Sequence, residues 1–117
     1  MQVQIFGTRK CKDTRKAERF FKERRVQIHF VDLTQKAASK GELRRFAQKF
    51  GVEALVDRDS RRFGEMGLQA AHYGEGRWLD ILSEEPLILR TPHVRFQAHV
   101  TMGLAESTWK EWVAGDR

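Results

Sequence analysis

The stretch VQIFGTRKCKDTRKAERFFKERRVQIHF, residues 3–30, decides the fold. It opens with a short apolar run that Gly7 ends, which predicts a buried strand. Residues 13–24 follow with apolar side chains at helical spacing and basic ones between them, which predicts an amphipathic helix. Residues 26–30 then alternate between apolar and polar, the period of a second strand. A strand, a helix and a strand within about thirty residues form a βαβ unit, whose two strands run parallel.

The middle of the chain predicts helices instead of strands. Ser39 and Glu42 are spaced as a capping box, in which each side chain bonds the other residue's backbone N–H. Gly51 is placed to end the helix that follows in a left-handed turn. Residues 34–84 therefore predict a helical insertion, with helices expected at 39–50, 61–68 and 77–83.

The last part of the chain returns to strand patterns after Pro86. Strands are expected at 87–89, 94–96 and 99–102, and a final helix at 107–113. We expect Trp109 and Trp112 of this helix to pack in the core. The overall order is βαβ, a helical insertion, then ββα, which is an α/β fold. A length of 117 residues fits a single domain over residues 1–117.

The charged residues are distributed unevenly along the chain. It has 22 Lys+Arg against 16 Asp+Glu, a formal net charge of +6, which fits nucleic acid, an acidic partner or an anionic small molecule. The densest basic run brackets the only cysteine, and consists of Arg9, Lys10, Lys12, Arg15 and Lys16. The N-terminus has neither a signal peptide nor a membrane-spanning run, so we expect a cytoplasmic protein. One cysteine excludes an internal disulfide.

Cys11 is the residue around which we expect any chemistry. It precedes the first helix, whose N-terminal N–H groups and dipole favour a negative charge. Together with the basic side chains, they should lower the pKa of the thiol below its ordinary value of about 8.5 and favour the nucleophilic thiolate. The alternative is that Cys11 is an ordinary small residue near a loop.

Four segments of the chain carry a family resemblance. They are IFGTRKCKDTRKAERFFKERR (5–25) followed by FVDL (30–33), ALVDRDSRRFGEMGL (54–68), LILRTP (87–92) and MGLAESTWKEW (102–112). In this order they resemble the arsenate reductase / Spx family, in a branch with a single cysteine. The resemblance implies a thioredoxin-like fold with a helical insertion between its two halves.

The resemblance also implies a set of site residues. Cys11 matches the family's nucleophile, and Pro92 its cis proline. Three guanidiniums would bind a tetrahedral oxyanion, because planar forks hold oxygens bidentately; the alternative for Arg58 and Arg90 is a surface ion pair. The catalytic residues would be Cys11, Arg15, Arg58 and Arg90. The expected substrate contacts are Lys12, Thr14, Thr91 and Pro92.

Departures from the family pattern constrain the chemistry. Thr14 stands where redox-switch relatives carry a second cysteine, and Gly7 replaces a histidine of well-studied reductases. The second thiol must therefore come from outside the chain, with glutathione as co-substrate and glutaredoxin as a possible partner. No bound cofactor and no metal site are expected, because the four histidines are scattered. His93, after Pro92, is expected to be a solvent-facing turn residue, near Cys11 if the proline turn abuts the site.

Three functions are compatible with these residues. The first is a glutathione-linked thiol reductase resembling arsenate reductases and acting on an oxyanion or a small thiol compound. The second is a regulatory protein of the Spx type that binds RNA polymerase. The third is a family member without catalytic activity that binds an anion or a thiol.

Overall fold

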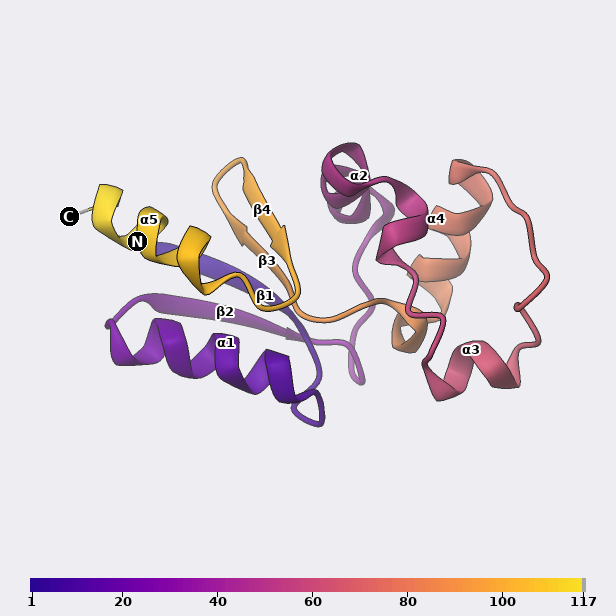
Figure 1. Cartoon of the computed structure of the whole chain (residues 1–117), viewed down its shortest axis with the longest axis horizontal. Helices are drawn as coiled ribbons and strands as arrows, with labels where there is room; N and C mark the ends of the chain where they lie inside the picture. Colours follow the sequence, from indigo (N-terminus) through magenta and orange to yellow (C-terminus); the bar gives the residue numbers. More distant parts are fainter. Residues whose placement is uncertain (117) are drawn as a thin grey trace. The chain divides into compact units, whose positions relative to one another are not determined.

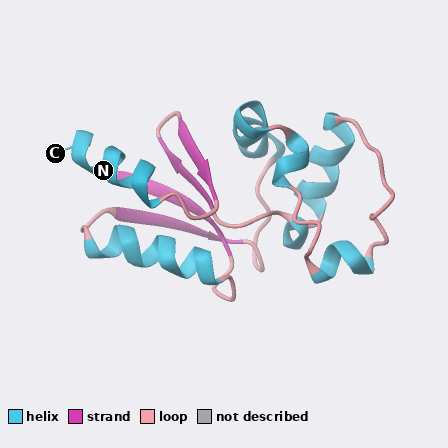
Figure 2. Cartoon of the chain, in the orientation of Figure 1, coloured by secondary structure: helices cyan, strands magenta, loops and turns pink. Residues whose placement is uncertain are grey.

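The chain forms two compact units. In the computed structural model, which describes residues 1–116, one unit contains residues 1–32 together with the chain from Thr91 onward, and the other contains Leu33–Arg90. Figure 1 shows the sheet in the first unit and a group of helices in the second, and Figure 2 shows that only the first unit contains strands. The expectation of a single domain over residues 1–117 stays a prediction.

The sheet unit contains four strands and two helices. Its elements are β1 (Gln2–Gly7), α1 (Lys12–Glu23), β2 (Gln27–Asp32), β3 (His93–Phe96), β4 (His99–Met102) and α5 (Glu106–Asp116). The strand order is β2-β1-β3-β4. β1 and β2 are parallel, whereas β3 is antiparallel to both β1 and β4. The predicted order of βαβ followed by ββα is confirmed.

Alternation along β1 places the core of this unit on one face of the sheet. Val3 and Ile5 are buried against α1 and α5, and the ring of Trp109 in α5 lies 5.5 and 5.3 Å from those of Phe20 and Phe21. The Trp109 indole N–H donates to the Thr101 hydroxyl at 2.8 Å, so its polar atom is satisfied inside the core. The expectation that Trp109 is a core residue is confirmed.

The second unit is helical. Its elements are α2 (Lys40–Phe50), η1 (Val52–Leu55), α3 (Arg61–Glu65), α4 (Glu75–Glu84) and η2 (Pro86–Ile88). The predicted capping box is present, since the Glu42 N–H donates to the Ser39 hydroxyl and the Ser39 N–H donates to the Glu42 carboxylate. Gly51 follows α2 with a φ of 83°, a region that favours glycine.

Two expectations for this unit need correction. The segment 87–89 is not a strand, because Pro86 opens the short 3-10 helix η2 and only Leu89 makes a bridge, to Val56. The apolar run indicates that these side chains are buried, and Ile88 and Leu89 are both buried. A 3-10 turn buries apolar side chains as well as a strand does, so the run does not distinguish the two. The helix expected at 61–68 ends at Glu65, and Gly67, with a φ of 66°, turns the chain. Among residues 1–116, no helix is both long enough and apolar enough to cross a membrane.

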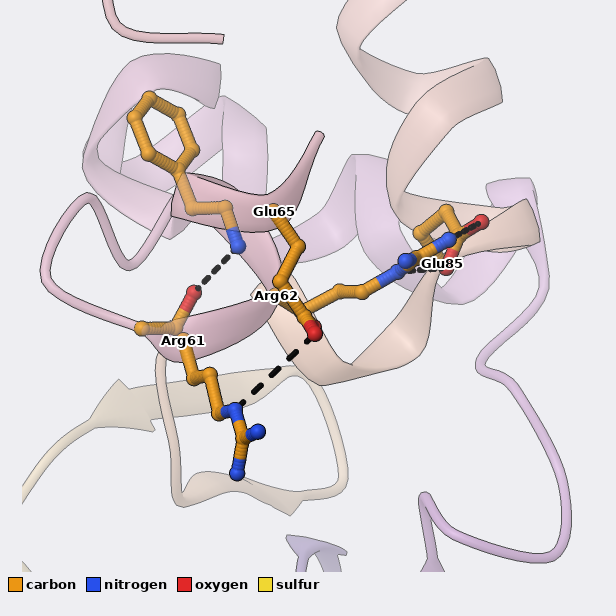
Figure 3. Close-up of polar contacts among 6 residues, drawn as sticks. Arg61, Arg62, Glu65 and Glu85 are labelled. Carbon is orange, nitrogen blue, oxygen red and sulfur yellow. Dashed lines mark hydrogen bonds and ion pairs between the residues drawn. The ribbon is translucent and has the colours of Figure 1, made fainter. Parts of the chain in front are cut away.

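An ion pair ties α3 to the start of η2. Figure 3 shows Arg62 reaching Glu85, whose carboxylate accepts from Nε at 2.9 Å and from Nη2 at 2.8 Å. This bidentate geometry joins residues 23 apart in the sequence, and planar guanidinium forks favour it. Hydrogen bonding from Arg62 holds the pKa of Glu85 below its ordinary value.

We expect the stabilisation from this pair to depend on pH. A carboxylate with a lowered pKa stabilises the folded state above its unfolded pKa, and this contribution disappears as pH falls through the folded pKa. Urea unfolding should therefore show Glu85→Gln less stable than the wild type at neutral pH, with the difference shrinking well below pH 4.5, the ordinary glutamate pKa. A difference that is constant from neutral to acid pH would contradict this.

Candidate active site at Cys11

Cys11 is the residue that caps the N-terminus of α1. Its backbone is extended, with φ −77° and ψ 122°. Its N–H donates to the Thr8 carbonyl at 3.0 Å, which closes the loop after β1, and its own carbonyl accepts from the Arg15 N–H at 3.1 Å. The side chain makes no capping hydrogen bond and is half-buried. The sulfur is thus left available for chemistry at the start of a helix.

The surroundings of the sulfur favour a thiolate. Burial raises the pKa of Cys11. Hydrogen bonds lower it by more, so that the pKa lies below its ordinary value; they come from the side chains of Thr14 and Thr91 and from the backbone of Thr14 and Asp13. The backbone bonds belong to the first turn of α1, as expected for a helix N-terminus. In the thiol form, Sγ lies 3.8 Å from the Thr91 carbonyl oxygen, an acceptor 80 residues away in the sequence.

Thr14 is buried, with none of its surface exposed, and hydrogen bonding from its hydroxyl lowers the pKa of Cys11. Its hydroxyl has no hydrogen-bond acceptor among residues 1–116 while Cys11 is a thiol. An ionised sulfur is a stronger acceptor than a thiol, so hydrogen bonding from this hydroxyl favours the thiolate. The sequence placed Thr14 among the substrate contacts and did not indicate this role.

Gly7 makes room for this arrangement. A Cβ on Gly7 would lie 2.5 Å from the Thr14 hydroxyl oxygen and 2.6 Å from its methyl carbon. Any other residue at position 7 would therefore displace Thr14 from its place beside Cys11. The absence of a side chain at this position, which appeared in the sequence only as a departure from the family pattern, has a steric reason.

We expect Thr14→Val to raise the pKa of Cys11. Valine keeps the shape of the buried side chain but donates no hydrogen bond to the thiolate, so the pH midpoint of iodoacetamide alkylation should move upward and the rate at neutral pH should fall severalfold. Thr108→Val on α5 is the matched control, and its profile should follow the wild type. If the two valine variants gave the same profile, the Thr14 hydroxyl would have no part in stabilising the thiolate.

The guanidinium of Arg15 contacts the loop that holds Cys11. Its Nη1 donates to the Arg9 carbonyl at 2.7 Å. Arg9 in turn stacks over the Phe30 ring, 4.4 Å from its centroid, and lies 3.7 Å from the Glu18 carboxylate. Arg15 therefore holds the loop, and both Arg15 and Lys12 are exposed residues of α1.

The proline turn lies against Cys11, as the Thr91 contact shows. The Thr91–Pro92 peptide bond is cis, in agreement with the resemblance. His93 needs correction: it is not a solvent-facing turn residue but the first residue of β3, with 1% of its surface exposed. The register explains this, because His93 pairs with Phe6 of β1 and with Met102 of β4 and so lies in the middle of the sheet.

Arg58 and Arg90 belong to the helical unit. The Arg90 N–H donates to the Leu55 carbonyl at 2.8 Å, next to the bridge between Val56 and Leu89. Arg58 follows two residues after Val56. Both side chains are exposed, and neither guanidinium forms an ion pair with a carboxylate of residues 1–116. Arg58 lies over two rings instead, 5.6 Å from Phe63 and 5.9 Å from Trp78. Their role at Cys11 stays a prediction.

The model of the ArsC family matches residues 6–112 of the chain. The chain belongs to the ArsC family. This match confirms the resemblance seen in the four sequence segments. Among curated proteins, the uncharacterized protein YusI of Bacillus subtilis is 23% identical over 115 residues, which cover 95% of this chain and 98% of YusI.

Solved structures show the fold of this ArsC family member. An arsenate reductase from Vibrio cholerae is 19% identical with a TM-score of 0.80, and the match covers 95% of this chain and 97% of that one. An ArsC family related protein from Bacteroides fragilis is 15% identical with a TM-score of 0.83, over 95% and 97% of the two chains. The predicted thioredoxin-like α/β fold is confirmed.

Proposed function

We propose that this ArsC family member is a glutathione-linked thiol reductase that resembles arsenate reductases and uses Cys11 as its nucleophile. The observation that carries the proposal is the position of Cys11 at the N-terminus of α1, where hydrogen bonds lower its pKa. A thiolate at neutral pH is what nucleophilic attack on an oxyanion or a mixed disulfide needs. Membership of the ArsC family supports the same chemistry.

In the proposed reaction, the Cys11 thiolate attacks the arsenic of arsenate. An As–S bond forms, an As–O bond breaks, and the oxygen leaves as water after taking up protons. One glutathione thiolate then attacks the Cys11 sulfur of the adduct, so that an S–S bond forms, the As–S bond breaks and its electron pair reduces As(V) to As(III). A second glutathione thiolate attacks the glutathione sulfur of this mixed disulfide, glutathione disulfide leaves and Cys11 returns as a thiolate. Exposed guanidiniums of Arg15, Arg58 and Arg90 would hold the negative charge of the oxyanion.

Glutathione is proposed because Cys11 is the only cysteine of the chain. Without a second thiol in the chain, the adduct on Cys11 can be resolved only by an external thiol. We place this chemistry in the cytoplasm, where glutathione keeps thiols reduced.

Arsenite formation tests the proposal. Purified protein, arsenate, glutathione and a glutaredoxin should together yield many equivalents of arsenite per chain, with one disulfide of glutathione per arsenite. Leaving out glutathione should abolish turnover, because the chain contains no second cysteine. No arsenite above the protein-free rate in the complete mixture would contradict arsenate as substrate. Continued turnover without any external thiol would contradict the role of glutathione.

A further inference from the structure

The net charge of the chain is concentrated in one segment. Residues 9–25 contain nine basic and three acidic side chains, which give +6, as large as the formal charge of +6 for the whole chain. This segment is the Cys11 loop, helix α1 and the turn after it. The cationic field of the protein therefore originates mainly from the element that carries the reactive cysteine.

On α1 these charges form a basic stripe, made of Lys12, Arg15, Lys16, Arg19 and Lys22. Spacings of three and four residues place them on one side of the helix, opposite the buried side that contains Thr14, Ala17, Phe20 and Phe21. None of the five forms an ion pair with a carboxylate of residues 1–116. Beside the stripe is a hollow of mixed charge, lined by the cations Lys16, Arg19, Arg24 and Lys110 and by Phe20, Glu23 and Glu106. Unpaired charges on one helix face form a surface that attracts anions.

We propose that the basic stripe is the docking surface for a protein reductant with an acidic surface around its reactive thiol. The inference rests on the proposed function and names the partner that would resolve the Cys11 adduct. Cys11 lies at the N-terminal end of the stripe, so a protein that covers the stripe can bring its thiol to the sulfur. Its thiolate attacks the Cys11 sulfur of the glutathione mixed disulfide, an S–S bond to the partner forms, and glutathione leaves as a thiolate. A second glutathione thiolate then attacks the partner's sulfur in the new disulfide, and Cys11 leaves as a thiolate.

The dimensions of the stripe favour a protein over the other anions. From Lys12 to Lys22 the helix rises about 15 Å at 1.5 Å per residue. Glutathione, with a single net negative charge, cannot cover five cations over this length. Nucleic acid has the charge density to do so, but it carries no thiol, and it would leave unexplained why the stripe ends at the only cysteine.

Release of a coloured thiol tests the docking surface without arsenate. The full chain is first converted to the mixed disulfide between Cys11 and 5-thio-2-nitrobenzoate, and the release of this group is followed by absorbance. One reductant is a glutaredoxin of net negative charge with a single active-site cysteine, and the other is 2-mercaptoethanol, which is small and neutral. The test variant is Lys16→Gln with Arg19→Gln, and the control, with the same loss of charge on α2, is Arg44→Gln with Arg45→Gln.

We expect the stripe variant to react with the acidic glutaredoxin about tenfold more slowly than the wild type, and the wild-type rate to fall similarly when salt is raised at constant pH. The control variant should stay within about twofold of the wild type, and 2-mercaptoethanol should react equally with all three chains. Because the readout contains no arsenate, a chain that reduces no arsenate can still show this pattern.

Three outcomes would overturn the proposal. The reaction with glutaredoxin could slow equally in the stripe variant and in the control variant, which would indicate only the effect of net charge. The reaction with 2-mercaptoethanol could slow as much as that with glutaredoxin, which would indicate an altered Cys11. A duplex DNA could bind the wild type and not the stripe variant while the glutaredoxin rate stays unchanged, which would assign the stripe to nucleic acid.

Discussion

Cys11→Ser is expected to lower the rate of arsenite formation at least about 100-fold, to the protein-free rate. A serine hydroxyl has nearly the size of the thiol but stays un-ionised at neutral pH, so the hydrogen bonds from Thr14 and Thr91 have no thiolate to stabilise. The substitution therefore removes the nucleophile and preserves the shape of the site. The measurement is arsenite produced per chain in the presence of glutathione and glutaredoxin.

Two controls make the loss interpretable. Cys11 is half-buried and its side chain makes no capping hydrogen bond, so the serine variant should unfold at the same urea concentration as the wild type. Cys11→Ala should be equally inactive, which would show that the serine hydroxyl does not act in place of the thiol. Equal arsenite formation by the wild type and both variants would refute catalysis by Cys11.

Trp109→Ala is expected to cost about 3–5 kcal/mol of the free energy of unfolding, as found for large aromatic side chains removed from protein cores. Trp109 has none of its surface exposed and packs against Phe20 and Phe21 of α1. Its removal leaves a cavity at the centre of the sheet unit and leaves the buried Thr101 hydroxyl without its donor. Urea unfolding followed by far-UV circular dichroism measures the loss.

Trp112, three residues along the same helix, provides the matched control. It is only half-buried and lies against the rings of Phe96 and His99, so Trp112→Ala should cost much less than Trp109→Ala. Trp109→Phe should fall between them, because it keeps most of the apolar contact and loses the hydrogen bond to Thr101. Similar losses for Trp109→Ala and Trp112→Ala would contradict this account of the core.

Local sequence patterns determined most of the elements. The alternation in residues 26–30 predicted β2, the spacing of Ser39 and Glu42 predicted the start of α2, and the run before Gly7 predicted β1. These patterns succeed because side chains close in the sequence set the period and the ends of an element. The segment 87–89 was predicted wrongly, because a short apolar run signals burial without distinguishing a strand from a 3-10 turn.

For the candidate site, the sequence by itself identified Cys11, its place before a helix and the direction of its pKa. Only the tertiary structure showed that the buried Thr14 hydroxyl lowers the pKa of Cys11, that Gly7 leaves room for Thr14, and that the carbonyl of Thr91 reaches Cys11 from 80 residues away. It also showed that His93 is buried, because pairing with β1 and β4 places that residue inside the sheet. The physical reason is that strand pairing and close packing bring together residues distant in the chain, and the periodicity of either segment alone carries no record of its partner.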